Sequence, residues 1–230
     1  MKLSSRLLSV AKKVAEGKGL ADIGSDHGKL PVYLVLNGVI PYAIASDSNA
    51  ASLKKAEELV FKMGLSEKIE LRVGYGLDVL LPDEVEQIVI AGMGAPLIAE
   101  IIDNAPQVST GVERLILQPM QYPEYLSRWL YENKFDIIDE DLAEDRGRIY
   151  RIFTCHKGTP APVEDDIYFE IGEKLIKNNH PLLHKYIKRI ISKYHYIYQH
   201  IIDDNEKTLI YTKLKKLEEI INEYESPDHL

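Results

Sequence analysis

Short apolar runs alternate with amphipathic runs between residues 20 and 156, and this alternation restricts the possible folds more than any other feature. Strands that pair in parallel need long crossovers, and helices supply them in α/β proteins. We expect strands at residues 19–23, 42–46, 69–73, 87–91 and 114–118. We expect helices at residues 30–36, 50–63, 96–104 and 122–132. The pattern therefore predicts a Rossmann-like, doubly wound parallel sheet.

The end of the chain predicts a different kind of structure. Strands at residues 135–142 and 149–155 flank the polar turn AEDRG, which indicates an antiparallel hairpin that closes the sheet. After the proline-containing linker HKGTPAPVEDD, we expect helices at residues 167–177, 181–202 and 209–224, the last two joined by the turn DDNE. We therefore expect one domain at residues 1–157 and a coiled-coil-like helical hairpin domain at residues 158–230.

The N-terminal sequence predicts an amphipathic helix that begins at Ser4 or Ser5 and ends at Gly17 or Gly19. Lysines at positions 12 and 13 interrupt the hydrophobic region that a signal peptide would need, and no later run is long and uncharged enough to span a membrane. The single cysteine, Cys155, excludes an internal disulfide and favours the cytoplasm. A net charge of −8 argues against broad, non-specific binding of nucleic acid.

The sequence DIGSDHG follows the first predicted strand and can be tested against two ligand-binding patterns. A dinucleotide-binding G-x-G-x-x-G requires glycine at positions 24, 26 and 29, but the chain has Gly24, Asp26 and Lys29. The alternate-glycine pattern of S-adenosylmethionine-dependent methyltransferases fits better, with Asp22, Gly24 and Gly28 in place and Asp26 at the middle glycine position. A plain tight turn is the alternative.

Later strand ends carry further candidates. Asp47 follows the loop by about 20 residues, where an acid can bind ribose hydroxyls, although Asp47 and Ser48 also fit a helix start. Tyr75 and Gly76 follow the third strand, and Tyr75 either stacks on or hydrogen-bonds to an adenine or is an ordinary, partly buried tyrosine.

The fourth and fifth strands end in residues suited to a substrate. Small residues in IAGMGA, from Ala91 through Gly94, let a substrate approach the cofactor. The Gln118 amide either hydrogen-bonds to the polar edge of a base or has its hydrogen bonds made by groups of its own loop.

LADIGSDHGKLP, GYGL, IAGMGA and ERLILQP, together with the terminal helical hairpin, resemble the bacterial tRNA (adenine-22, N1)-methyltransferase family over essentially the whole chain. The resemblance implies a class I methyltransferase fold that uses S-adenosyl-L-methionine, and a helical domain that binds tRNA. It implies that the cofactor is surrounded by Asp22, Gly24, Asp26, His27, Asp47, Gly76, Ala91 and Met93. Their neighbours complete our predicted cofactor set: Ser25, Gly28, Ser48, Tyr75 and Gly92.

Three residues depart from this family's usual pattern. Tyr75 stands where the family often has Asp, Ala95 where it often has Gly, and Met120 where it often has Asn. The first departure affects the family's usual contact with the adenine of the cofactor. The other two affect how the target base is positioned.

Methylation of adenine N1 uses a lone pair that the neutral base already has, so positioning is the main task of the enzyme. The product is a cation, which a nearby carboxylate would stabilise. Asp26 either plays this role or only caps the following helix or holds the methionine amine. The predicted catalytic residues are Asp26, Met93, Gly94 and Gln118.

The stretch from residue 174 to residue 202 contains no acid and carries the predicted RNA-binding residues Lys174, Lys177, Lys185, Lys188, Arg189 and Lys193. A solvated helix face is the alternative interpretation. His180 and His184 lie four residues apart, but Pro181 places His180 before the helix, and we expect no metal. The oligomeric state stays open, with a monomer favoured. Two other functions compete: an NAD-dependent oxidoreductase, and a catalytically silent nucleotide- or RNA-binding protein.

Overall fold

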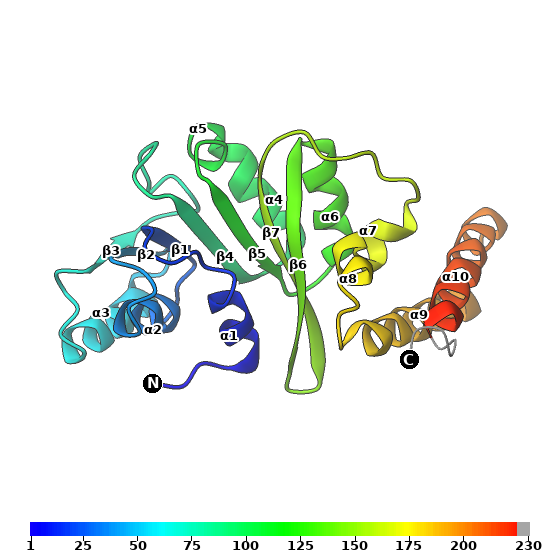
Figure 1. The fold of residues 1–230 in the computed structure, drawn as a ribbon, viewed down its shortest axis with the longest axis horizontal. Helices are drawn as coiled ribbons and strands as arrows, with labels where there is room; N and C mark the ends of the chain where they lie inside the picture. Colours follow the sequence, from blue (N-terminus) through cyan, green and yellow to red (C-terminus); the bar gives the residue numbers. More distant parts are fainter. Residues whose placement is uncertain (225–230) are drawn as a thin grey trace. The chain divides into compact units, whose positions relative to one another are not determined.

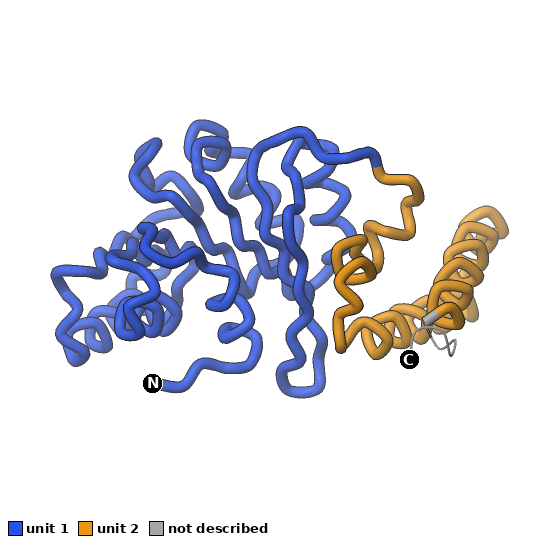
Figure 2. The backbone as a smooth tube through the Cα atoms, in the orientation of Figure 1, with its two compact units in different colours: residues 1–162 blue, residues 163–230 orange. Residues whose placement is uncertain are grey.

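A computed structural model describes residues 1–224 of the chain. The chain divides into two compact units, Met1–Pro162 and Val163–Leu230 (Figure 2). Among the described residues, no helix has the length and apolar character needed to cross a membrane.

The first unit is built on a seven-stranded sheet with the order β3-β2-β1-β4-β5-β7-β6 (Figure 1). The strands are β1 (Leu20–Ile23), β2 (Ala43–Asp47), β3 (Ile69–Val73), β4 (Gln87–Met93), β5 (Arg114–Pro119), β6 (Phe135–Asp145) and β7 (Arg148–Lys157). The first five strands pair in parallel, whereas β7 is antiparallel to both β5 and β6. The predicted fold class is confirmed.

Helices cover both faces of this sheet. Those of the first unit are α1 (Ser5–Ala11), α2 (Lys29–Leu36), α3 (Ala50–Lys62), α4 (Ala95–Asn104), α5 (Pro106–Ser109) and α6 (Pro123–Glu132). One apolar core contains residues of α1, α2 and α3, and a second contains residues of α4, α5 and α6. Successive residues of β1 alternate between these cores, with Leu20 in the first and Ala21 in the second, as expected of a strand buried on both faces.

The N-terminal helix is shorter than predicted. Ser4 caps it as expected, with its hydroxyl accepting the N–H of Leu7, but α1 ends at Ala11 rather than at a glycine. The reason lies in tertiary contacts. The buried Gln87 side chain exchanges two hydrogen bonds of 2.9 Å with the backbone of Ala15, and this pairing fixes the chain in a non-helical path.

The β6–β7 hairpin is longer than predicted. Its pairing continues to Asp145 opposite Arg148, so part of AEDRG belongs to a strand and only Arg146 and Gly147 form the turn. Both turn residues have positive φ, 48° and 74°, which matches the twist of a two-residue hairpin turn.

The second unit contains α7 (Ile167–Ile171), α8 (Glu173–Lys177), α9 (Leu183–His200) and α10 (Asp204–Tyr224). The single helix predicted at residues 167–177 is wrong, because Gly172, with φ of 87°, separates α7 from α8. The last helix begins earlier than predicted because the Asp203 carboxylate accepts the N–H groups of Asn205 and Glu206 and caps it.

The hairpin contains a buried ion pair. The Nε of Arg151 donates to Glu140 at 2.7 Å, and both side chains are almost completely buried. The Arg151 guanidinium also lies 4.6 Å from the centre of the Phe153 ring. Removing one partner of such a pair leaves a buried charge without compensation.

We expect Glu140→Ala to lower the free energy of unfolding by about 3 kcal/mol, because it leaves the buried Arg151 guanidinium without its carboxylate partner. The double variant Glu140→Met/Arg151→Met is expected to recover most of this loss. Urea denaturation followed by circular dichroism measures both. A loss below about 1 kcal/mol in the single variant would contradict this assignment.

Candidate methyl-donor and substrate cleft

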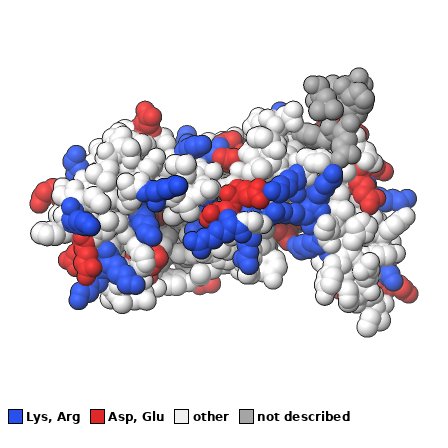
Figure 3. Space-filling model, turned by 90° about the horizontal axis from the view of Figure 1, so that it is seen from below, with Lys and Arg blue, Asp and Glu red and all other residues white. Residues whose placement is uncertain are grey.

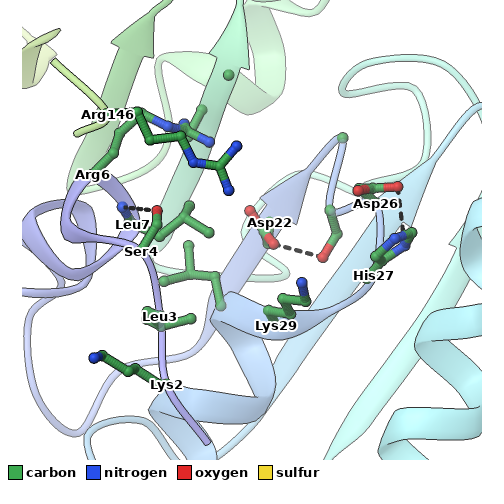
Figure 4. A pocket seen from close by; sticks show the side chains of 15 residues that line it. Lys2, Leu3, Ser4, Arg6, Leu7, Asp22, Asp26, His27, Lys29 and Arg146 are labelled. Carbon is green, nitrogen blue, oxygen red and sulfur yellow. Dashed lines mark hydrogen bonds and ion pairs between the residues drawn. The ribbon is translucent and has the colours of Figure 1, made fainter. Parts of the chain in front are cut away.

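A cleft of about 600 Å³ opens where β1 and β4 end (Figure 4). It is lined by the N-terminal segment, the loop after β1, the start of α2, the end of β4 and the β6–β7 turn. Parallel α/β sheets bind their ligands at this edge, beyond the carboxyl ends of the strands. The predicted site residues in its lining are Asp22, Gly24, Ser25, Asp26, His27, Ala91 and Gly92.

Asp22 provides a buried carboxylate in this cleft. It is 5% exposed, and burial raises its pKa to about 6. The Ser25 hydroxyl donates to it at 2.6 Å and acts in the opposite direction, as does the charge of Arg6, while Asp47 raises the pKa further. A cationic group bound beside Asp22 would favour its ionised form.

The loop after β1 brings its backbone close to the cleft. Gly24 has φ of 72°, and a Cβ there would lie 2.2 Å from Cε of Met93, so a side chain would collide with the end of β4. Gly28, also at positive φ, lies against Ala56 of α3. The Ser25 N–H donates to the Ser46 carbonyl at 2.8 Å and ties the loop to β2. The two glycines thus serve close packing, and only Gly24 of the two lines the cleft.

Asp47, at the end of β2, connects the loop to α3. Its carboxylate accepts the Asp26 N–H at 3.1 Å and the Asn49 N–H at 2.8 Å. Asp26 has φ of 52°, its side chain is mostly exposed, and its carboxylate lies 3.1 Å from Nδ1 of His27. Asp47 itself is not in the cleft lining, nor is its neighbour Ser48.

Gln118 is completely buried and is not in the cleft lining. Its side-chain oxygen accepts a hydrogen bond from Arg6 of α1, and its Nε2 donates to the Pro119 carbonyl at 2.7 Å. Its amide is therefore already paired within the protein. Burial lowers the pKa of Arg6, an effect opposed by the charges of Tyr150, Asp145 and Asp22.

The remaining predicted residues of this unit are not in the cleft lining. Tyr75 is 45% exposed, and its hydroxyl donates to Glu100 at 3.0 Å, a bond that raises its pKa. Gly76 packs against Ile101, and Gly94 is the residue before α4. Met93 reaches the cleft region through its contact with Gly24.

Sequence reasoning missed the basic residues of the cleft. Its lining includes Lys2, Arg6, Lys29 and Arg146, which come from three separate parts of the chain. No local motif marks them, since the first two belong to a segment whose pattern indicates only an amphipathic helix. The apolar and small residues of the lining that were also missed are Leu3, Ser4, Leu7 and Leu30.

The predicted RNA-binding residues all belong to the second unit, on α8 and α9. Figure 3 shows basic side chains gathered over α9. Lys177 forms an ion pair of 2.6 Å with Glu173, four residues earlier. Within residues 1–224, no group of three or more His, Cys, Asp and Glu side chains is arranged to hold a metal ion.

The cleft fits S-adenosyl-L-methionine in its chemistry. The cofactor carries a sulfonium and an ammonium, and two carboxylates, those of Asp22 and Asp26, line the cleft. Gly24 lines the cleft beside them.

Comparison with known proteins decides the family. The model of the tRNA (adenine(22)-N(1))-methyltransferase family matches residues 20–225. The chain belongs to this family. A tRNA (adenine(22)-N(1))-methyltransferase of Bacillus subtilis is 40% identical over 172 residues, which are 75% of this chain and 72% of the relative.

Solved structures agree with this assignment to the tRNA (adenine(22)-N(1))-methyltransferase family. A Streptococcus pneumoniae protein in complex with S-adenosyl-L-methionine matches with a TM-score of 0.86 at 32% identity, covering 96% of this chain and 100% of that one. TrmK of M. capricolum, in complex with S-adenosyl-homocysteine, matches with a TM-score of 0.84 at 27% identity, covering 96% and 99%. Neither alternative function finds support in these comparisons.

We expect the affinity for S-adenosyl-L-methionine to depend on the ionisation of Asp22. A bound cation lowers the pKa of the Asp22 carboxyl from about 6. The affinity for S-adenosyl-L-methionine is therefore highest well above pH 6, and it falls as the pH decreases through and below this value. Asp22→Asn should weaken binding by about tenfold at pH 8 and abolish this pH dependence. Because Asn removes a buried charge, the melting temperature should not fall.

Titration calorimetry between pH 5 and pH 8 measures this dependence. Asp78→Asn is the matched control, because Asp78 is exposed and lies outside the cleft lining. A pH dependence that persists unchanged in Asp22→Asn would assign the titration to another group.

Proposed function

We propose that this protein transfers the methyl group of S-adenosyl-L-methionine to N1 of adenine 22 in the D-arm of tRNA. The observation that carries the proposal is the loop at residues 22–28, which places a buried carboxylate and a glycine backbone in a cleft at the carboxyl edge of the sheet. Membership of the tRNA (adenine(22)-N(1))-methyltransferase family supplies the substrate and the position.

The reaction requires alignment more than activation. The cofactor supplies a methyl group on a sulfonium, which is reactive toward a lone pair in line with the carbon–sulfur bond. Adenine N1 has such a lone pair at neutral pH, so the protein must hold N1 opposite the methyl group and exclude water. No general base is needed to create the nucleophile.

The end of β4 is suited to the approach of a base. Gly92 has φ of 88° and carries no side chain into the cleft, so a planar ring can come close to the backbone there. The Met93 carbonyl accepts the Met120 N–H at 2.7 Å, which braces this turn against the end of β5. We assign base positioning to Met93 and Gly94 on these grounds.

N1 lies on the edge of adenine that forms base pairs. The base must therefore leave its pair before the reaction, at a cost of a few kcal/mol that contacts with the RNA must offset. We infer that the lysines and arginine of α8 and α9 provide part of these contacts, since they form an acid-free basic stretch within an acidic protein.

Incubation of the purified protein with labelled S-adenosyl-L-methionine and unmodified tRNA tests the proposal. We expect N1-methyladenosine at position 22, mapped by nuclease digestion and mass spectrometry. A tRNA carrying guanosine at position 22 is the control and should accept no label there. Methylation at another position would contradict the assignment, and absence of transfer to any RNA would favour a silent binding protein.

The N-cap of α2 is Gly28, with no side-chain capping hydrogen bond, so Asp26 does not cap this helix. Two roles remain for Asp26, and one substitution separates them. If its exposed carboxylate stabilises the cationic product, Asp26→Asn should lower kcat about tenfold or more and leave the Kd for S-adenosyl-L-methionine unchanged. If it holds the methionine amine, the Kd should rise instead. Single-turnover kinetics together with calorimetry distinguish these outcomes.

A further inference from the structure

The cleft has a mixed lining in which Lys2 and Lys29 accompany two arginines and two carboxylates. Asp22 and Asp26 lie on the side of the loop after β1, whereas Arg6 and Arg146 lie together on the other side (Figure 4). The methyl donor is cationic at its sulfonium and its ammonium, so the two carboxylates account for it. The donor also carries a single carboxylate, whereas the two guanidinium groups together offer hydrogen-bond donors for more than one anion.

Arg146 occupies a position that does not favour arginine. It is the first residue of the two-residue turn between β6 and β7, with φ of 48°, where Asn, Asp or Gly is preferred. Its guanidinium makes no hydrogen bond or ion pair among the described residues, yet it lines the cleft. The hairpin therefore does not depend on this charge, and the side chain is available to a ligand.

Arg6 faces the same space from α1. One of its nitrogens donates to Gln118, and its guanidinium lies 5.9 Å from the centre of the Tyr150 ring. It also lies beside Gly92, where an added Cβ would be 3.4 Å from Nη1 of Arg6. A guanidinium has five N–H donors, so the bond to Gln118 leaves others for a bound anion.

We propose that Arg6 and Arg146 form a clamp for a backbone phosphate of the nucleotide that enters the cleft for methylation. The inference rests on the proposed function and adds the residues that seat the substrate. Guanidinium groups match phosphate oxygens in charge and in geometry, and phosphate contacts set the position of a nucleic acid rather than its sequence. The clamp holds the RNA backbone on one wall while the methyl donor lies on the other.

Arg146→Asn is the decisive variant, because Asn-Gly is a favoured sequence for this turn and the hairpin should fold unchanged. We expect the KM and the Kd for tRNA to rise about tenfold, with an unchanged Kd for S-adenosyl-L-methionine and an unchanged melting temperature. The slope of log Kd for tRNA against log salt concentration should fall by about 0.7–0.9, as expected for one lost phosphate contact.

Arg148→Gln is the matched control. It removes the same charge from the same hairpin, at an exposed residue outside the cleft lining. If Arg146→Asn and Arg148→Gln have the same effect on tRNA affinity and on its salt dependence, the clamp is refuted, because only the general charge of the hairpin then matters.

Arg6→Lys tests the other half of the clamp. It keeps the charge but loses the planar fork, and it should raise the KM for tRNA while leaving the Kd for S-adenosyl-L-methionine unchanged. A weaker Kd for S-adenosyl-L-methionine would assign Arg6 to the carboxylate of the methyl donor and overturn its part in the clamp.

Direct tRNA binding separates failure of the clamp from failure of the proposed function. If the wild-type protein methylates adenine 22 and Arg146→Asn binds tRNA as the control does, only the clamp fails. If the wild-type protein transfers no methyl group but Arg146→Asn still weakens tRNA binding with the predicted loss of salt dependence, the proposed function fails and the clamp stands.

Discussion

The parallel pairing of β1 with β2 and with β4 is the constraint on which the site depends. Asp22 pairs in register with Ala45 on one side and with Val89 on the other, so the carboxyl ends of the three strands lie at one edge of the sheet. A carboxylate at the end of such a central strand is buried by its neighbours, which raises its pKa. The same pairing brings the loop after β1 into contact with Met93 of β4 and Ser46 of β2.

The opposite wall of the cleft depends on how the N-terminal segment is fastened to the sheet. The Gln87 side chain binds the backbone of Ala15, and Arg114 donates to the Lys13 carbonyl at 2.8 Å. The Lys13 ammonium in turn pairs with Asp139 at 2.8 Å and with Asp141 at 3.2 Å on β6. These polar contacts fasten the chain just after α1 to β4, β5 and β6, and Arg6 of α1 reaches Gln118 of β5.

The helical unit has its own polar centre. Glu170 of α7 is buried and accepts hydrogen bonds from Tyr194 of α9 at 2.6 Å and from Lys213 of α10 at 2.5 Å. One carboxylate thus connects three helices around an apolar core that includes Leu183, Leu214 and Leu217. A buried acid with two donors has its hydrogen-bonding capacity met, so its burial does not leave an unpaired charge.

The sequence by itself determined the sheet, because strands buried on both faces leave continuous apolar runs and crossover helices leave a 3.6-residue period. It also located Asp22, Gly24 and Asp26, because a strand followed directly by a glycine loop is a local pattern. Packing decided the rest. The α1 helix ends early because Gln87 binds the backbone of Ala15. The buried Gln118 has its side-chain oxygen paired by Arg6. Arg6 and Arg146, which meet in the cleft lining, are separated by most of the sequence of the first unit. Such contacts join residues far apart in the chain, so only the tertiary structure brings them together.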